Sequence, residues 1–266
     1  MTTLSCYIDG IGLLGPAMND WTASLPLMIG QLPYEYRKTV LPSPACLPPN
    51  ERRRCGPIVK LTLAVGQEAA SAAGREPSGL PTVFSASGGD GNNCHELCEM
   101  LATDDRQISP TRFHNSVHNA AAGYWSIAMR AMTPSSVLCA HDASFGAGLL
   151  EAMSQTVADR TSVLLIACDT TYPEPLRTAR PIPDDFGVAL VLSPSRSAAS
   201  IAMITVALTP EPADTLHDPA LERLRAGVPA ARSLPMLQAI AAMRPGSVVL
   251  DYHDSQNLAV GVTPCC

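Results

Sequence analysis

The stretch SSVLCAHDASFGAGLLEAMSQTVADRTSVLLIACD, residues 135–169, contains the unit that decides the fold. Its first six residues predict a strand, residues 144–159 have apolar positions at helical spacing, and TSVLLIACD predicts a second, buried strand. A strand, helix and strand in this order imply a right-handed crossover between two parallel strands. We therefore predict an α/β fold in which helices cover a sheet.

The same alternation continues on both sides of this unit. Strands are predicted at 4–15 and 80–88, and helices at 58–74, 92–101 and 115–132. Two further strands, at 184–194 and 200–210, are joined by a Ser-rich turn and are predicted to pair as an antiparallel edge. Within residues 1–209 we expect a mixed, mostly parallel five-stranded sheet between helices.

The C-terminal part changes in composition. Residues 210–233 are rich in Pro, Asp, Ala and Arg and are predicted to be a linker. LPMLQAIAAM, from 234, predicts a helix, and residues 246–264 predict a β-hairpin with its turn at HDSQ, 253–256. We expect residues 234–266 to be a small helix and hairpin appendage.

Composition limits the function classes. The chain has 266 residues, 46% of them hydrophobic but only 5% aromatic, which predicts a core of small and aliphatic side chains. A net charge of −6 argues against nucleic acid as a partner, because a phosphate backbone requires a basic face. No apolar stretch is long enough for a membrane span or a signal peptide, so we expect a cytoplasmic protein with no membrane insertion. An odd number of cysteines, nine, then indicates reduced thiols.

No stretch predicts a metal or cofactor site. CHELC, 94–98, lacks a second ligand pair, and HNSVH, 114–118, lacks the glutamate of zinc proteases. SGGDGNN, 87–93, lacks the Walker lysine and dinucleotide-binding spacing, and is better explained as a strand-to-helix connection. We therefore expect neither a metal nor a cofactor.

Four stretches carry a family resemblance. ERRRCGPIVKLTLAVGQEA, from 51, resembles the helix that follows the arginine-containing loop of β-ketoacyl synthases. NSVHNAAAGYWSIAMRAM resembles their N-x-x-x-G helix, with Asn119 and Gly123; HDASFGAGLLEAM resembles the nucleophile turn, and SVLLIACD with DDFGVALVLSP the strand pair after it. Residues 1 to about 208 therefore resemble the N-terminal half of a β-ketoacyl synthase of the thiolase fold. The resemblance is closest to the short chain-length-factor-like proteins of aryl polyene and xanthomonadin-type pathways, and it implies a thiolase-like layered half-fold.

Two departures from the family change the expected chemistry. The resemblance places Asp142 where the synthases carry their acyl-accepting cysteine, and a carboxylate is a poor acyl acceptor. The C-terminal half that supplies two catalytic histidines has no counterpart, because His217 and His253 lie in a predicted linker and turn. No Cys-His-His set can be assembled, so no catalytic residue is assigned. Cys139 remains a weak nucleophile candidate, predicted to lie inside a strand, and Ser144 lacks the nucleophile-elbow spacing.

The resemblance implies a non-catalytic subunit that forms a heterodimer with a complete β-ketoacyl synthase and helps to form or gate its acyl tunnel. Two alternatives stay open: an acyltransferase or decarboxylase in its own right, and a docking scaffold for an acyl carrier protein. Arg52, Arg53 and Arg54 are candidates for carrier-protein docking, or else a solvated loop face. The residues expected at the tunnel or partner interface are Phe113, His114, Ser116, Val117 and Asn119.

Overall fold

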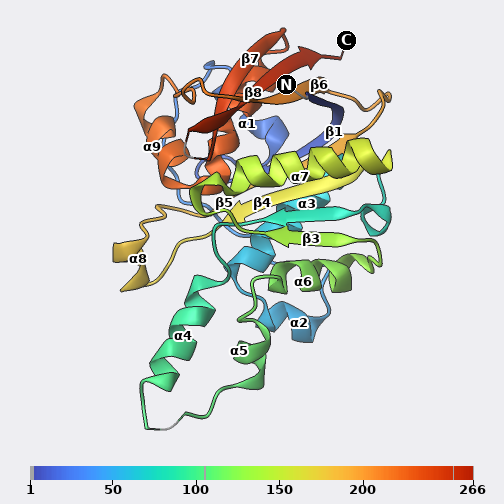
Figure 1. Cartoon of the computed structure of the whole chain (residues 1–266). Coiled ribbons are helices and arrows are strands. Elements are labelled where there is room, and N and C mark those ends of the chain that lie inside the picture. The colour runs from blue at the N-terminus through green and yellow to red at the C-terminus, as the bar shows by residue number, and fades with distance from the viewer. Residues whose placement is uncertain (1–2, 105, 254, 266) are drawn as a thin grey trace.

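One mixed sheet organises the chain. The structure, a computed structural model, describes residues 3–104, 106–253 and 255–265. Over these ranges eight strands lie in the order β3-β2-β4-β5-β1-β6-β8-β7 (Figure 1). The strands are β1 (Leu4–Leu14), β2 (Thr82–Ser85), β3 (Ser135–Leu138), β4 (Val163–Asp169), β5 (Phe186–Ser193), β6 (Ala202–Thr209), β7 (Gly246–His253) and β8 (Gln256–Pro264).

The mixed α/β sheet is confirmed, but its expected strand count and its mostly parallel character are wrong. Only β2 pairs in parallel, with β3 and β4, while the other five pairings are antiparallel. The reason is that β1 lies between β5 and β6 and runs antiparallel to both. The hairpin predicted from β5 to β6 is therefore also wrong, and the Ser-rich segment between them crosses the end of β1 instead.

Helices cover both faces of the sheet (Figure 1). On one face α3 packs against β1, β4 and β5, with α6 beside it; on the other lie α7 and α10. At Gly12 a side chain would collide with the backbone of Val65, so glycine allows α3 to approach β1 closely. The helices are α1 (Trp21–Met28), α2 (Pro49–Arg54), α3 (Pro57–Ala72), α4 (Gly91–Leu101), α5 (Pro110–His114), α6 (Ala120–Met129), α7 (Ser144–Asp159), α8 (Leu176–Ala179), α9 (Pro219–Gly227) and α10 (Leu234–Ala241). No helix within the described ranges is long and apolar enough to cross a membrane.

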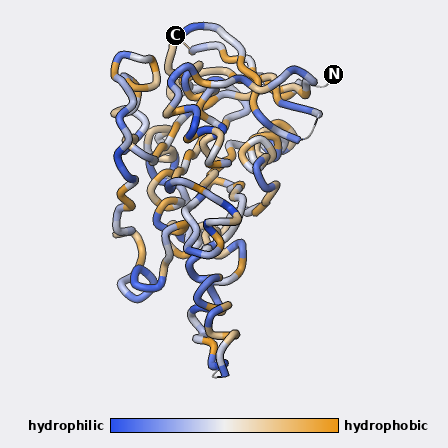
Figure 2. Tube along the Cα trace, turned by 90° about the vertical axis from the view of Figure 1, so that its left-hand side faces the viewer, coloured by the Kyte–Doolittle hydropathy of each residue, from blue (hydrophilic) through white to orange (hydrophobic). Residues whose placement is uncertain are grey.

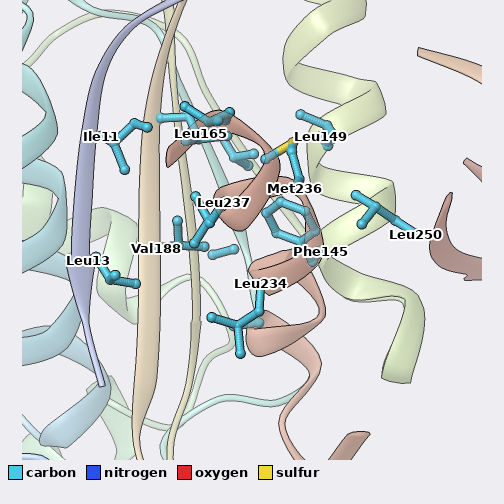
Figure 3. Close-up of a cluster of buried hydrophobic side chains, with 14 of the residues drawn as sticks. Ile11, Leu13, Phe145, Leu149, Leu165, Val188, Leu234, Met236, Leu237 and Leu250 are labelled. Atoms are coloured by element: carbon cyan, nitrogen blue, oxygen red, sulfur yellow. The ribbon is translucent and has the colours of Figure 1, made fainter. Parts of the chain in front are cut away.

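The C-terminal helix and hairpin belong to the same sheet and core. β8 pairs with β6 from Asn257 to Pro264, and β7 pairs with β8, which adds two strands to the sheet. Leu234 and Leu237 of α10 are fully buried with Phe145 and Leu149 of α7, and Figure 3 shows these side chains close together beside the sheet. The segment predicted as a linker contains α9 and the turn η3 (Pro229–Ser233). The predicted helix and hairpin exist, therefore, but they belong to the sheet and its core rather than extending from the domain.

An arm formed by α4 and α5 extends from the body of the molecule (Figures 1 and 2). α4 buries only Gly91, Asn93 and Leu97, and α5 buries no residue. The helix predicted over 115–132 begins only at Ala120, because turns occupy the residues between α5 and α6. The SGGDGNN stretch connects β2 to α4, as predicted, with the Asp90 carboxylate capping α4 at the Asn93 N-H.

Candidate functional site

The segments that follow β2, β3 and β4 meet at one end of the sheet. In α/β folds, ligand sites commonly lie beyond the carboxyl ends of parallel strands. After β3 the chain turns at His141, whose φ of 52° is in the left-handed region, and enters the short turn η2 (His141–Ala143). Asp142 lies in this turn, two residues before α7 begins at Ser144.

Two arginines hold Asp142. Arg180 Nη2 lies 2.6 Å from Asp142 Oδ1, and Arg232 Nη2 donates to Oδ2 at 3.1 Å. Partial burial favours the neutral carboxyl, but the close ion pair with Arg180 and the charge of Arg232 outweigh it, so the pKa of Asp142 lies below its usual value. The carboxylate is therefore ionised and committed to cations, which disfavours its use as an acyl acceptor.

The ion pairs continue into the C-terminal part of the chain. Arg232 Nη1 lies 3.7 Å from Asp251 Oδ1 on β7, and Asp251 also pairs with Arg225 of α9. Arg225 in turn binds Glu222 at 2.7 Å. This ion-pair network connects η2 with η3, β7 and α9. Asp142 therefore helps to hold the C-terminal segment against the start of α7.

A second, fully buried carboxylate lies beside this network. Asp169 Oδ1 accepts from the Ser87 backbone N-H at 2.8 Å and from its hydroxyl at 2.6 Å, and Oδ2 accepts from the Ala230 N-H at 2.8 Å. Burial raises the pKa of Asp169 to about 6 in spite of these donors. Asp169 thus joins the end of β2 to η3, the turn that presents Arg232.

Cys139 is exposed, and its predicted place inside a strand is wrong. β3 ends one residue earlier because Ala140 and His141 leave the extended conformation. The Cys139 thiol donates to the Ser87 carbonyl at 3.3 Å. Ser144, by contrast, is buried, and its hydroxyl donates to the His141 carbonyl at 2.7 Å, which is a structural role.

Replacement of Asp142 by asparagine is expected to lower the free energy of unfolding at pH 7 by about 1 kcal/mol, since partly exposed ion pairs contribute modestly. Because the folded-state pKa of Asp142 is lowered, this stabilisation is present above pH 4 and is lost as the pH falls below it. Urea unfolding at pH 7 and pH 3 checks this. Equal costs at both values would contradict the ion-pair role.

The residues predicted at a partner interface lie on one exposed segment. Phe113 and Val117 expose 68% and 50% of their surface, and His114, Ser116 and Asn119 are exposed as well. On α6 the same side continues through Gly123, where an added Cβ would meet nothing within 4 Å, to the exposed Ile127. We call Asn119, Gly123 and Ile127, which recur every four residues, the α6 face. Next to it, β3 is an edge strand of the sheet.

The three arginines of α2 have local partners. Arg52 donates to the Ala45 and Leu47 carbonyls at 3.2 and 3.0 Å, and Arg54 lies 3.4 Å from Glu51. Arg53, which bonds Asn50, and Arg54 are exposed. Carrier docking by these residues stays a prediction. Over the described ranges, no three His, Cys, Asp or Glu side chains are grouped so that they could hold a metal.

An apolar cavity lies between α3, the end of β2 and the segment 117–122. Ile58, Phe84, Val117, Ala121 and Ile166 are among the residues that line it. Its volume is about 20 Å³, space for roughly one water molecule. This cavity cannot by itself accommodate an acyl chain.

Neither Arg180 nor Arg232 was predicted as a site residue. Both lie in segments that the sequence marks only by proline and polar composition, so no spacing rule connects them to Asp142. Asp169 had a weak signal, a carboxylate at the end of a continuous apolar strand, which is an unfavourable place for a charge without partners.

Comparison with known proteins gives one family match and several similar structures. A profile described as the β-ketoacyl synthase N-terminal domain matches residues 30–247. No curated protein matches the sequence. A chain of the ketosynthase ApeO in complex with its chain length factor ApeC, from Xenorhabdus doucetiae, has a TM-score of 0.73 at 22% identity, over 97% of this chain and 99% of that chain.

Two further structures extend the likeness. A chain of AntDE:AntF, an acyl-carrier protein in complex with its ketosynthase bound to the hexaketide, has a TM-score of 0.74 at 11% identity, over 99% of this chain and 100% of that one. The ketosynthase from module 1 of the bacillaene synthase of Bacillus amyloliquefaciens FZB42 has a TM-score of 0.57 at 14% identity. The matched region includes 80% of this chain and 47% of the bacillaene ketosynthase chain. At these identities the likeness establishes the thiolase-like fold.

Proposed function

The chain belongs to the β-ketoacyl synthase N-terminal-domain family, and we propose that it is a non-catalytic, chain-length-factor-like subunit of a complete β-ketoacyl synthase. Its role is to form or gate the partner's acyl tunnel in polyene or fatty-acid-type biosynthesis. The observation that carries this proposal is Asp142, which stands before α7 as an ionised carboxylate bound by Arg180 and Arg232. At the position where the resemblance expects a reactive thiol, the chain has a carboxylate held in two ion pairs.

The exposed surface supports a protein partner. Phe113, Val117 and Ile127 are large apolar side chains that the chain alone leaves exposed to water, and exposed apolar side chains that lie together commonly mark interfaces. β3 leaves one edge of the sheet without a neighbouring strand over the described ranges. A complete β-ketoacyl synthase is the partner we propose, because similar chains occur in a ketosynthase complex with a chain length factor.

The tunnel would have to be completed by that partner. The cavity beneath Val117 is too small for an acyl chain, so chain-length control by this subunit would act at the shared surface. Phe113, His114, Ser116, Val117 and Asn119 are the residues proposed to line it. The acyl carrier protein would bind through the complex. The exposed cations Arg53 and Arg54 are the residues of this chain proposed to contact it. The complex is proposed to act in the cytoplasm.

Acyl loading tests the proposal. The chain, the ketosynthase and the reconstituted pair are each incubated with radiolabelled acyl carrier protein. We expect label on the ketosynthase and none on this chain. Label on this chain that disappears in Cys139→Ala or Asp142→Ala would instead support an acyltransferase or decarboxylase, for which the exposed Cys139 thiol is the favouring observation. Carrier binding without any ketosynthase binding would support the docking scaffold.

Gly123→Ala is expected to have opposite effects on the isolated chain and on the pair. Glycine inside a helix costs about 0.5–1 kcal/mol relative to alanine, and nothing in the chain obstructs a methyl group here, so the isolated chain should gain about that much stability. If a partner packs closely on the α6 face, the methyl group should weaken the pair severalfold. Thermal unfolding and titration calorimetry check the two effects. A more stable chain that binds equally well would remove Gly123 from the interface.

A further inference from the structure

Two thiols stand one helical turn apart on the arm. Cys94 and Cys98 of α4 are both exposed. Burial raises the pKa of the Cys94 thiol, and the neighbouring Cys98 raises it further. Their neighbour His95 is engaged elsewhere, with Nε2 3.3 Å from Glu99. Over the described ranges no third ligand joins them to form a metal group, so the chemistry open to the pair is that of a dithiol.

A disulfide between them requires α4 to change shape. Side chains four residues apart on a helix have Cβ atoms about 5–6 Å apart. A disulfide requires about 3.5–4.5 Å. Oxidation of Cys94 and Cys98 must therefore distort or unwind the turn between them, and such strained, exposed disulfides are the labile ones.

The arm can accommodate this distortion at low cost. α4 buries three residues and α5 none, and both lie away from the two helix layers (Figures 1 and 2). Segments with so few buried contacts open locally at a small fraction of the global stability. Unwinding part of α4 would leave the sheet and the core intact.

The same turn of α4 holds α5 in place. Asn93 Nδ2 donates to the Arg112 carbonyl at 2.9 Å, and the Arg112 guanidinium pairs with Glu96. Cys94 lies between these two contacts, and Arg112 directly precedes Phe113. A distortion across residues 94–98 therefore releases the segment that begins the proposed partner surface.

We propose that Cys94 and Cys98 form a redox site whose oxidation to a disulfide unwinds α4 and weakens partner docking. The docking part of this inference rests on the proposed function. The oxidant is a small-molecule disulfide such as oxidised glutathione. One protein thiolate attacks it and releases the first glutathione thiol; the second protein thiolate then attacks the mixed disulfide and releases the other. Two thiols and one disulfide thus give one protein disulfide and two small thiols.

The isolated full chain tests the site itself. After treatment with oxidised glutathione, the peptide containing both cysteines should lose about 2 Da, and the far-UV circular dichroism should lose about one helical turn. Cys98→Ser should yield a glutathione adduct on Cys94 without that helical loss. Adducts without a bridge in the wild-type chain, or a bridge with unchanged circular dichroism, would overturn the proposal.

Binding to the ketosynthase tests the consequence. Oxidation should raise the Kd at least about tenfold for the wild-type chain and for Cys265→Ser, a control thiol that follows β8 and lies outside the arm, but not for the Cys94→Ser/Cys98→Ser variant. An equal Kd for the reduced and bridged wild-type chain would overturn the switch. If the reduced chain binds no ketosynthase, the proposed function fails, while the experiment on the isolated chain still decides the redox site.

Discussion

Ile127→Asp is expected to weaken binding of the chain to a complete β-ketoacyl synthase by at least about 100-fold in Kd, which corresponds to about 2.7 kcal/mol. Ile127 exposes 49% of its surface on α6, on the same face as Gly123, where the chain itself leaves open space. A partner that packs there would bury the new carboxylate without a counter-charge, at a cost of several kcal/mol. The folded chain alone should tolerate the change, because the side chain is already in contact with water.

The matched control is Val157→Asp. Val157 is also an exposed apolar residue on a helix, with 41% of its surface accessible, but it lies on α7, on the opposite face of the sheet. The Val157→Asp substitution should leave the Kd within about twofold of the wild-type value, a difference in binding free energy below about 0.5 kcal/mol. Titration calorimetry measures both, after circular dichroism confirms that both variants fold. Similar Kd values for Ile127→Asp and wild type would indicate that the α6 face is not part of the interface.

Local patterns predicted most elements of the fold, because they depend on neighbouring residues. The apolar spacing of 58–74 gives α3, which ends at Ala72, followed by Gly74 with a φ of 61°. The continuous apolar run of β4 marks a strand buried on both faces. Strand order was not available from such patterns. That β1 separates β5 from β6 is decided by long-range pairing, for which the sequence alone carries no periodic signal.

For a similar reason, only part of the candidate site could be predicted from the sequence. Asp142 could be placed through a resemblance along the chain, since it directly precedes a well-marked helix. Its partners come from segments 38 and 90 positions away, Arg180 and Arg232, and only the folded arrangement of η3 and the α8 loop brings them together. The exposure of Cys139 depended on where a four-residue strand ends, which is the least predictable feature of any element.

Asp169 makes stability depend on pH in a direction opposite to that of most carboxylates. Its pKa rises from 3.8 to about 6 on folding, chiefly because the side chain is completely buried. The folded chain therefore holds this proton more tightly than the unfolded chain does. Stability from this group is greatest below pH 4 and declines as the pH rises to about 6, by about 3 kcal/mol at 1.36 kcal/mol per pKa unit. Asp185, whose pKa is also raised by burial, contributes in the same direction.

Asp169→Asn is expected to remove that dependence. The amide cannot accept at both of its terminal atoms, so one of the buried N-H groups of Ser87 and Ala230 loses its acceptor, at a cost of about 1–3 kcal/mol at every pH. The amide does not titrate, however. The wild-type advantage should therefore be largest near pH 4 and about 3 kcal/mol smaller at pH 7. Urea unfolding at intervals from pH 4 to pH 7 measures this difference.

The matched control for Asp169→Asn is Asp214→Asn, because Asp214 also accepts a backbone N-H, that of Val249 at 2.8 Å, but at an exposed site. Because this carboxylate is exposed, its replacement should cost no more than about 1 kcal/mol at pH 7. If Asp169→Asn shows a difference from wild type that does not change with pH, the charge of Asp169 is compensated in the folded chain by its three donors and by Arg180. If it shows the expected slope, burial destabilises the ionised form of Asp169 in the folded chain by more than the hydrogen bonds from Ser87 and Ala230 stabilise it.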